Sequence, residues 1–173
     1  MGFSIPSEPA LQLIADRRYP RLLDDVVVRL VAGEVLAVAV VAAATRQLWL
    51  FGPLAADFTL RTVLGPKASP LAWLARKARP RLKAAPRLVP SPPKRFASTL
   101  GAVFSLAIVV LAWTGPAALA WAIVALMLVF PALESLAGIC VGCQVFSLLM
   151  RLGIIPETVC LECADLSRRV TTG

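Results

Sequence analysis

The chain has 173 residues, of which 58% are hydrophobic and only 16% are charged, and its formal net charge is +8. A soluble domain is about a quarter charged. With its lower charged fraction and a mean hydropathy of +0.78, this chain has too few polar groups to cover an ordinary globule. This composition also excludes disorder, which requires low hydrophobicity, and it favours an integral membrane protein.

Two apolar segments follow a polar N-terminal part at 1–25 that lacks the apolar core of a cleavable signal peptide. We expect 26–44 and 48–64 to span the membrane as helices, with their charges sheltered inside a bundle. These charges are Arg29, Glu34, Asp57 and Arg61. Because Asp57 and Arg61 are four residues apart, they are predicted to pair on one helix face. One span followed by a re-entrant or interfacial segment is the alternative.

The connection at 65–95 holds nine lysines and arginines and no acidic residue. Leu71, Leu74 and Ala75 recur at helical spacing beside basic residues, which predicts an amphipathic helix on an anionic inner leaflet. The basic residues from Arg76 onward are not interleaved with aromatic ones that would stack on bases. We therefore expect the lipid bilayer as a partner and no nucleic acid.

A helical hairpin is predicted next, because Phe96 to Leu133 is a run of 38 residues without a charge. A single helix of that length would be about 57 Å long, nearly twice the ~30 Å hydrocarbon core. Gly115 and Pro116 near the middle predict a turn. The two spans are expected at about 96–113 and 117–137.

Lysines and arginines concentrate near the two ends of the chain and at 65–95, while the two turns expected on the other side hold only Arg46. The positive-inside rule therefore places both termini and the connection in the cytoplasm. The predicted fold is all-α: a four-helix transmembrane bundle within 26–156 of the inner (plasma) membrane. A basic cytoplasmic loop and a cysteine-bearing tail at 153–173 complete it.

The four cysteines form two matched pairs, Cys140 with Cys143 and Cys160 with Cys163, in the pattern C-x2-C-x16-C-x2-C. This spacing is typical of a four-thiolate zinc site, for which two short pairs supply the donors. The chain has no histidine, which excludes Cys/His metal sites and histidine-based catalysis. The sequence assigns no cofactor, and zinc is a candidate on this spacing.

A dithiol is the alternative, because cysteines three apart have the usual redox spacing. Cys140 and Cys143 are expected on an interfacial helix at 138–152, and the second pair in the aqueous tail. Cytosolic thiols stay reduced, so the first pair would act as metal ligands, redox groups or sulfur carriers. Packing alone is a further alternative. Glu134, six residues before Cys140, is expected to lack a partner and to exchange protons with the thiols.

Gly138 and Gly142 flank the first cysteine and allow two interpretations. Their spacing permits another helix to approach closely. Alternatively, both glycines loosen the helix end, so that a new helix starts near Cys143 and its terminal amides stabilise a thiolate.

Three segments carry a resemblance to a known family: LGPKASPLAWLARKARPRL (64–82), PPKRFA (92–97) and GICVGCQVFSLLMRLGIIP (138–156). They resemble the membrane-protein family catalogued as domain of unknown function 4395, over roughly Val26 to Pro156. The resemblance implies a small multi-span protein, often encoded in bacteria near thioredoxin-like and rhodanese-like proteins. The resemblance therefore implies a thioredoxin-like or rhodanese-like partner. It also matches Cys140 and Cys143 to the family's cysteine motif.

Three functional hypotheses follow, with no enzyme class assigned. The first is a membrane thiol protein that exchanges electrons or sulfane sulfur with a thioredoxin-like or rhodanese-like partner through Cys140 and Cys143, with Glu134 as proton carrier. The second is a non-enzymatic scaffold in which all four cysteines bind zinc. The third is a small sulfur-oxyanion transporter in which Arg29 and Arg61 neutralise the anion.

Overall fold

The computed structural model describes residues 22–82, 84–85 and 87–155. The N-terminal segment up to residue 21 and the tail with Cys160 and Cys163 lie outside the described residues. In chain order the described elements are β1 (Leu22–Asp24), α2 (Asp25–Thr45), η1 (Leu48–Leu50), α3 (Phe51–Val63), α4 (Pro70–Ala78), η2 (Arg79–Arg81), β2 (Leu88–Pro90), α5 (Ser91–Thr114), α6 (Ala117–Ala132), η3 (Leu133–Ala137) and α7 (Val141–Arg151).

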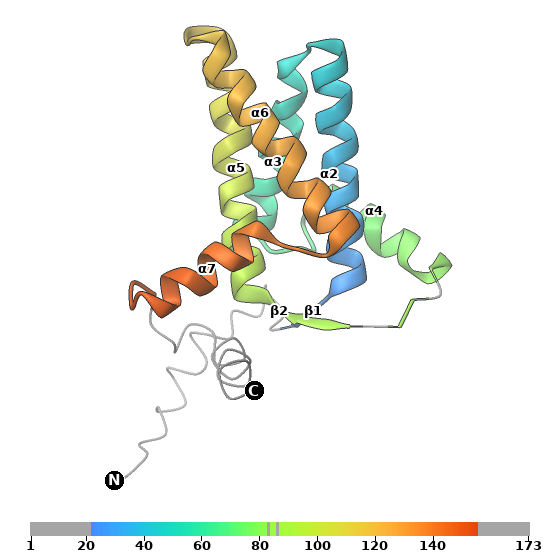
Figure 1. The fold of residues 1–173 in the computed structure, drawn as a ribbon. Helices are drawn as coiled ribbons and strands as arrows, with labels where there is room; N and C mark the ends of the chain where they lie inside the picture. The colour runs from blue at the N-terminus through green and yellow to red at the C-terminus, as the bar shows by residue number, and fades with distance from the viewer. Residues whose placement is uncertain (1–21, 83, 86, 156–173) are drawn as a thin grey trace.

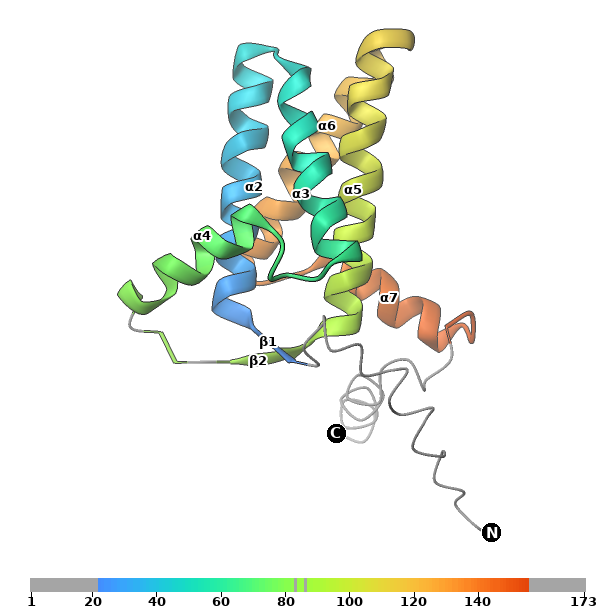
Figure 2. The same ribbon diagram turned by 180° about the vertical axis from the view of Figure 1, so that it is seen from behind.

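Four helices, α2, α3, α5 and α6, lie side by side in a bundle (Figure 1). α3 packs mainly on α5, α5 also packs on α6, and α6 packs on α2, whereas the sequence neighbours α2 and α3 touch each other little. The α2–α3 and α5–α6 turns lie at one end of the bundle (Figure 2). The opposite end carries the β1–β2 ladder, α4 and α7, and we call it the base.

Three of these helical segments are long and apolar enough to cross a membrane: α2, α5 and Ala117–Ala137. Large apolar side chains on them, including Val40, Val103 and Val129, are about half exposed, at 50%, 55% and 51%. An apolar surface of this extent is expected of lipid contact rather than of a soluble monomer. α3 has 13 residues and is shorter than a full span, so the fourth crossing stays a prediction.

The four tryptophans of the chain lie toward the ends of the bundle, where amphipathic rings favour a membrane interface. Trp49 lies in the connection between α2 and α3, and Trp113 and Trp121 lie in α5 and α6 close to the turn at Gly115, at the end opposite the base. Trp113 is 83% exposed. Trp73 belongs to α4 at the base. Their distribution agrees with a bundle whose long axis crosses a bilayer.

The core lies between the four helices and includes Val35, Phe51 and Ile108, all almost fully buried. Gly101 of α5 allows α3 to approach closely, since a Cβ there would come within 2.6 Å of the Phe58 ring. The absence of a Cβ at Gly101 therefore permits the extensive packing of α3 on α5.

The α5 helix begins at Ser91, five residues before the predicted span, because Pro92 and Pro93 fall in its first turn. Proline is tolerated there, since a first-turn N–H has no partner within the helix. Just before it, β2 pairs antiparallel with β1, with Leu22 opposite Pro90. This short ladder was not predicted, and it joins the starts of α2 and α5.

The predicted amphipathic helix of the basic connection is present as α4, but its apolar residues divide between two sides. Ala72 and Ala75 are buried against Val31 of α2, whereas Trp73 and Leu74 are about half exposed. Thus only part of the apolar face of α4 is free for contact with lipid.

Candidate thiol site at the base of the bundle

The chain leaves α6 through a widened turn that positions the residues of the site. Pro131 lacks an N–H, and the helix continues beyond it as the π-turn Leu133–Ala137. Gly138 then adopts a left-handed conformation with a φ of +71° and ends the turn. Glycine adopts this conformation without strain, so the chain can reverse toward Cys140.

Arg29 of α2 holds this turn in place. Its Nη2 donates hydrogen bonds of 3.0 Å to the carbonyl oxygens of Ser135 and Leu136. Carbonyl groups at a helix end have no partner within the helix, so the guanidinium satisfies them. Arg29 therefore binds backbone oxygens rather than a carboxylate, and it fixes the turn that carries Glu134.

The first cysteine pair lies at the N-terminus of α7. Cys140 is the N-cap residue, and its Sγ accepts a hydrogen bond of 3.4 Å from the Cys143 N–H. Cys140 is 8% exposed, while Cys143 is only partly buried. A helix N-terminus with its free N–H groups favours negative charge, so the predicted thiolate-stabilising geometry exists, with Cys140 rather than Cys143 at the cap.

The two thiols differ in acidity. A hydrogen bond from the Cys143 thiol lowers the pKa of Cys140 below the usual thiol value, and the nearby Lys94 charge acts in the same direction. The same hydrogen bond and burial raise the pKa of Cys143. When the pair loses one proton, the negative charge therefore resides on Cys140.

The glycines flanking Cys140 have separate roles, and each of the two interpretations applies to one of them. Gly138 ends the preceding turn, as described. Gly142 permits a close crossing of α7 over α5, because a Cβ at this position would come within 2.6 Å of the Ala97 Cβ. Phe146 and Phe96 pack beside this crossing with ring centroids 5.7 Å apart.

Glu134 lies beside the thiols, as the sequence predicted, but it is paired. Lys94 Nζ and Glu134 Oε1 are 2.6 Å apart. The expectation of an unpartnered Glu134 was wrong, because α5 begins early and brings Lys94 into the bundle. A carboxylate oxygen without a hydrogen-bond partner does exist, but it is Oε2 of Glu34 on α2.

Sequence reasoning missed Lys94, which it assigned to the basic connection. The signal was present, since Lys94 precedes Gly115 by 21 residues and Glu134 follows it by 19. A hairpin folded at Gly115 therefore brings these two charges to the same level.

The predicted pair of Asp57 and Arg61 is confirmed, and it has a wider role. Asp57 Oδ1 also accepts hydrogen bonds from Ser69 Oγ, at 2.8 Å, and from the Leu71 N–H, at 3.1 Å. One buried carboxylate thus connects Arg61 to the start of α4. Arg61 and Arg29 both have protein acceptors, which weakens the expectation that they neutralise a transported anion.

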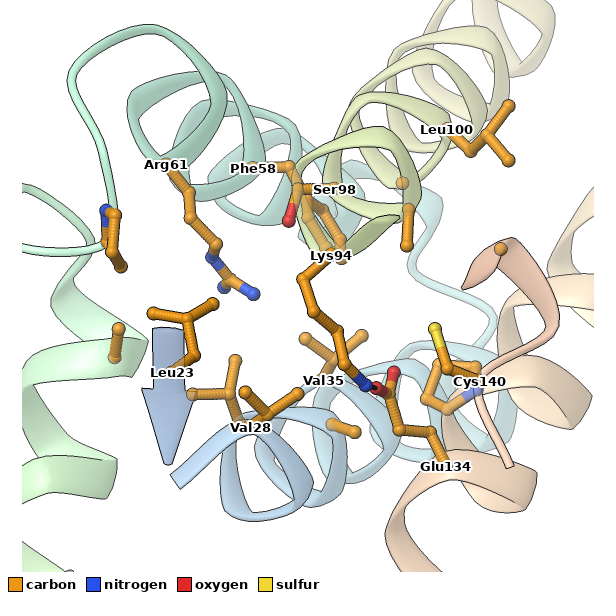
Figure 3. A pocket seen from close by; sticks show the side chains of 18 of the residues that line it. Leu23, Val28, Val35, Phe58, Arg61, Lys94, Ser98, Leu100, Glu134 and Cys140 are labelled. Atoms are coloured by element: carbon orange, nitrogen blue, oxygen red, sulfur yellow. Dashed lines mark hydrogen bonds and ion pairs between the residues drawn. The ribbon is translucent and has the colours of Figure 1, made fainter. Parts of the chain in front are cut away.

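A cavity of about 450 Å³ occupies the basal half of the bundle, and Cys140 forms part of its wall. Figure 3 shows Arg61 on one side, Cys140 on the other, and Lys94 reaching between them to Glu134. Most of the lining is apolar and comes from the bundle helices. The lining includes Cys140 but not Cys143, so the two thiols face different surroundings.

The zinc hypothesis has no test in the described part of the chain. There, no three Cys, Asp or Glu side chains come together as a metal site. Cys160 and Cys163, which complete the predicted set of four thiolates, lie outside the described residues.

The fold and the site together define a multi-pass helical membrane protein with a thiol pair at the base of its bundle. The chain belongs to the family described as Domain of unknown function (DUF4395), whose model matches residues 23–151. The match includes Lys94, Glu134, Cys140 and Cys143, and it ends before Cys160. Neither the comparison with curated proteins nor the comparison with solved structures finds a match.

Proposed function

We propose that the protein is a membrane thiol protein that exchanges electrons or sulfane sulfur with a cytosolic thioredoxin-like or rhodanese-like partner. The observation that carries this proposal is the inequality of the two thiols. Cys140 is nearly buried at the N-cap of α7 with a lowered pKa, whereas Cys143 is more accessible. Two neighbouring cysteines that differ in this way in burial and acidity are suited to thiol–disulfide exchange.

The asymmetry assigns a role to each cysteine. In the oxidised protein, a partner thiolate attacks the accessible Cys143 sulfur, and Cys140 leaves as the thiolate. A thiol of lower pKa is the better leaving group, so exchange in this direction is fast. A second thiol of the partner then releases Cys143, which leaves a dithiol here and a disulfide in the partner.

Glu134 and Lys94 complete the proposed site. Both act electrostatically on the two thiols, with Lys94 favouring and Glu134 opposing negative charge on them. Glu134, held by Lys94 beside the thiols, is a proton carrier in this proposal.

The proposal places the base of the bundle on the cytoplasmic side of the inner membrane. Six of the described basic side chains belong to α4 and the connection around it: Lys67, Arg76, Lys77, Arg79, Arg81 and Arg87. Basic residues outside the spans favour the cytoplasm, where reducing conditions keep the thiol pair active. Four crossings, with α3 as a short fourth span, keep all these residues on one side.

The experiment uses a purified thioredoxin variant that lacks its second active-site cysteine. The protein, solubilised in detergent and oxidised with diamide, is mixed with this variant under anaerobic conditions. We expect a stable mixed disulfide at Cys143, located by mass spectrometry of peptides. Cys160→Ser should leave trapping unchanged, and Cys143→Ser should abolish it.

Two outcomes would contradict the proposal. The first is a mixed disulfide only at Cys160 or Cys163. The second is a stoichiometric zinc ion that protects all four thiols and is lost equally in Cys143→Ser and Cys160→Ser, which would favour the zinc scaffold. Treatment with inorganic polysulfide separates the two forms of the proposal, because only sulfur transfer predicts a persulfide on the pair.

A further inference from the structure

The cavity beside Cys140 has the size and position of a ligand site within the bilayer. Its volume of about 450 Å³ lies within the range of small-molecule pockets, ~300–1,000 Å³. Its walls include Val35, Phe104 and Met127, which belong to the three segments able to span a membrane. The cavity therefore lies among segments that are apolar enough to contact lipid, which favours a ligand that dissolves in the membrane.

The ion pairs on the bundle helices favour an uncharged ligand. Four cations line the cavity: Arg61, Lys67, Arg76 and Lys94. Arg61 and Lys94, the two on the bundle helices, are already paired with Asp57 and Glu134 respectively. Arg76 of α4 donates to the Pro66 carbonyl oxygen, and Lys67 belongs to the connection before α4. An anionic ligand would have to compete with these carboxylates, whereas a neutral one would leave both ion pairs intact.

One buried donor beside the cavity, on the lining residue Arg61, lacks an acceptor. Nε of Arg61 has no hydrogen-bond partner, and an unsatisfied buried polar group costs about 1–3 kcal/mol. The guanidinium lies 5.0 Å from the centroid of the Phe58 ring, and Phe104 and Phe130 also line the cavity. The complementary ligand is a flat apolar ring that carries oxygen acceptors.

These features, together with the sulfur of Cys140 on the wall, lead to one chemical class. We propose that the cavity binds a membrane quinone, which oxidises the thiol pair. This inference rests on the proposed function, since it supplies the electron acceptor for the same two cysteines.

The reaction balances without a further reagent. Cys140 and Cys143 together lose two electrons and two protons, and a disulfide bond forms between their sulfur atoms. The quinone gains two electrons and two protons and leaves as the hydroquinone. The dithiol partner of the proposed function then reduces the disulfide, which closes the cycle.

The different surroundings of the two thiols separate the two half-reactions of this proposal. Cys140 lines the cavity and Cys143 does not, so the quinone meets Cys140 inside the bundle while the partner meets Cys143 outside it. Arg61 can donate to a quinone oxygen as negative charge develops there during the transfer.

The test uses ubiquinone-1, whose ring is fully substituted, so that thiol addition to the ring cannot imitate electron transfer. The reduced protein in quinone-free detergent is mixed with it under anaerobic conditions, and hydroquinone and disulfide are both measured. We expect equal amounts of the two products. Cys140→Ser should yield neither.

A cavity-filling variant separates this inference from the proposed function. Val28→Trp places a large side chain at the cavity wall, and Val40→Trp places the same side chain on the half-exposed outer face of α2 as a control. Val28→Trp should lose quinone reduction and keep trapping by thioredoxin, while Val40→Trp should keep both.

The outcomes are distinguishable. Trapping at Cys143 without any quinone reduction in the wild-type protein would overturn the quinone inference alone. Unchanged quinone reduction in Val28→Trp would show that the reaction takes place outside the cavity and would also overturn it. Loss of both activities in the wild-type protein would overturn the proposed function as well.

Discussion

Gly142 of α7 and Ala97 of α5 are in direct contact, so that a Cβ on Gly142 would come within 2.6 Å of the Ala97 Cβ and 2.9 Å of its Cα. Distances this short force one of the two helices to move. Because Cys140 caps the same helix, this crossing determines where its sulfur lies relative to the cavity.

Gly142→Ala should therefore displace α7 and lower the stability of the protein, by about 1–3 kcal/mol as for other overpacked sites. The displacement should also slow exchange at Cys143. Gly52→Ala is a matched control, since a Cβ there meets no atom within 4 Å. Unfolding in detergent and the rate of thioredoxin trapping measure the two effects, and equal behaviour of both variants would contradict the prediction.

Asp57→Ala should destabilise the protein more than the double change Asp57→Ala with Arg61→Ala. The single change leaves a guanidinium in the bundle without its carboxylate, which costs about 3–5 kcal/mol at buried sites. Both variants lose the bonds to Ser69 and to the Leu71 N–H, so those losses cancel in the comparison. Equal unfolding free energies would show that the two charges do not depend on each other.

The alkylation of Cys140 by iodoacetamide should rise with pH earlier than that of a free thiol, whose pKa is about 8.5. The reason is that the thiolate reacts, and the pKa of Cys140 is lowered. Cys143→Ala and Lys94→Met should each shift the profile to higher pH, because each removes a group that favours the thiolate. Glu134→Gln should shift it to lower pH.

The measurement requires Cys160→Ser and Cys163→Ser in every variant, so that only Cys140 and Cys143 can react, and fragment spectra must assign the label to one of these two residues. A profile that does not move in either Cys143→Ala or Lys94→Met would show that neither group stabilises the Cys140 thiolate.

Reporter fusions should place the connection at 65–95 and the C-terminus in the cytoplasm, and residue 115 on the other side. The expectation follows from the positive-inside rule and from the short α3 acting as a span. An external signal from the C-terminal fusion would show an odd number of crossings, and it would move the thiols away from cytosolic partners.

The helical architecture was predictable because its signals are local and long. The charge-free run from Phe96 to Leu133 predicts a helical hairpin, and this prediction does not depend on the exact residues at which the helices begin and end. α5 and α6 confirm the hairpin. The early start of α5 was missed because Pro92 and Pro93 argue against the interior of a helix, although proline is compatible with a first helical turn. The β1–β2 ladder spans three residues on each strand, which is too short for any periodic pattern.

The site was partly predictable. The spacing of Cys140 and Cys143 and the nearness of Glu134 are visible along the chain, and the structure brings these three residues together. The pairing of Glu134 with Lys94 and the cavity are not local properties. Each depends on how four helices pack, and hydropathy does not specify which helices become neighbours.

The order of the helices around the bundle has a consequence for synthesis in the membrane. The first pair of helices packs mainly on the second pair, α3 on α5 and α2 on α6, so neither pair contains its own final interface. A ribosome delivers α2 and α3 before their principal neighbours exist. During that interval Arg61 already has its partner Asp57 on the same helix, whereas Arg29 must wait for the carbonyl oxygens of Ser135 and Leu136. The engagement of Arg29 therefore coincides with completion of the bundle.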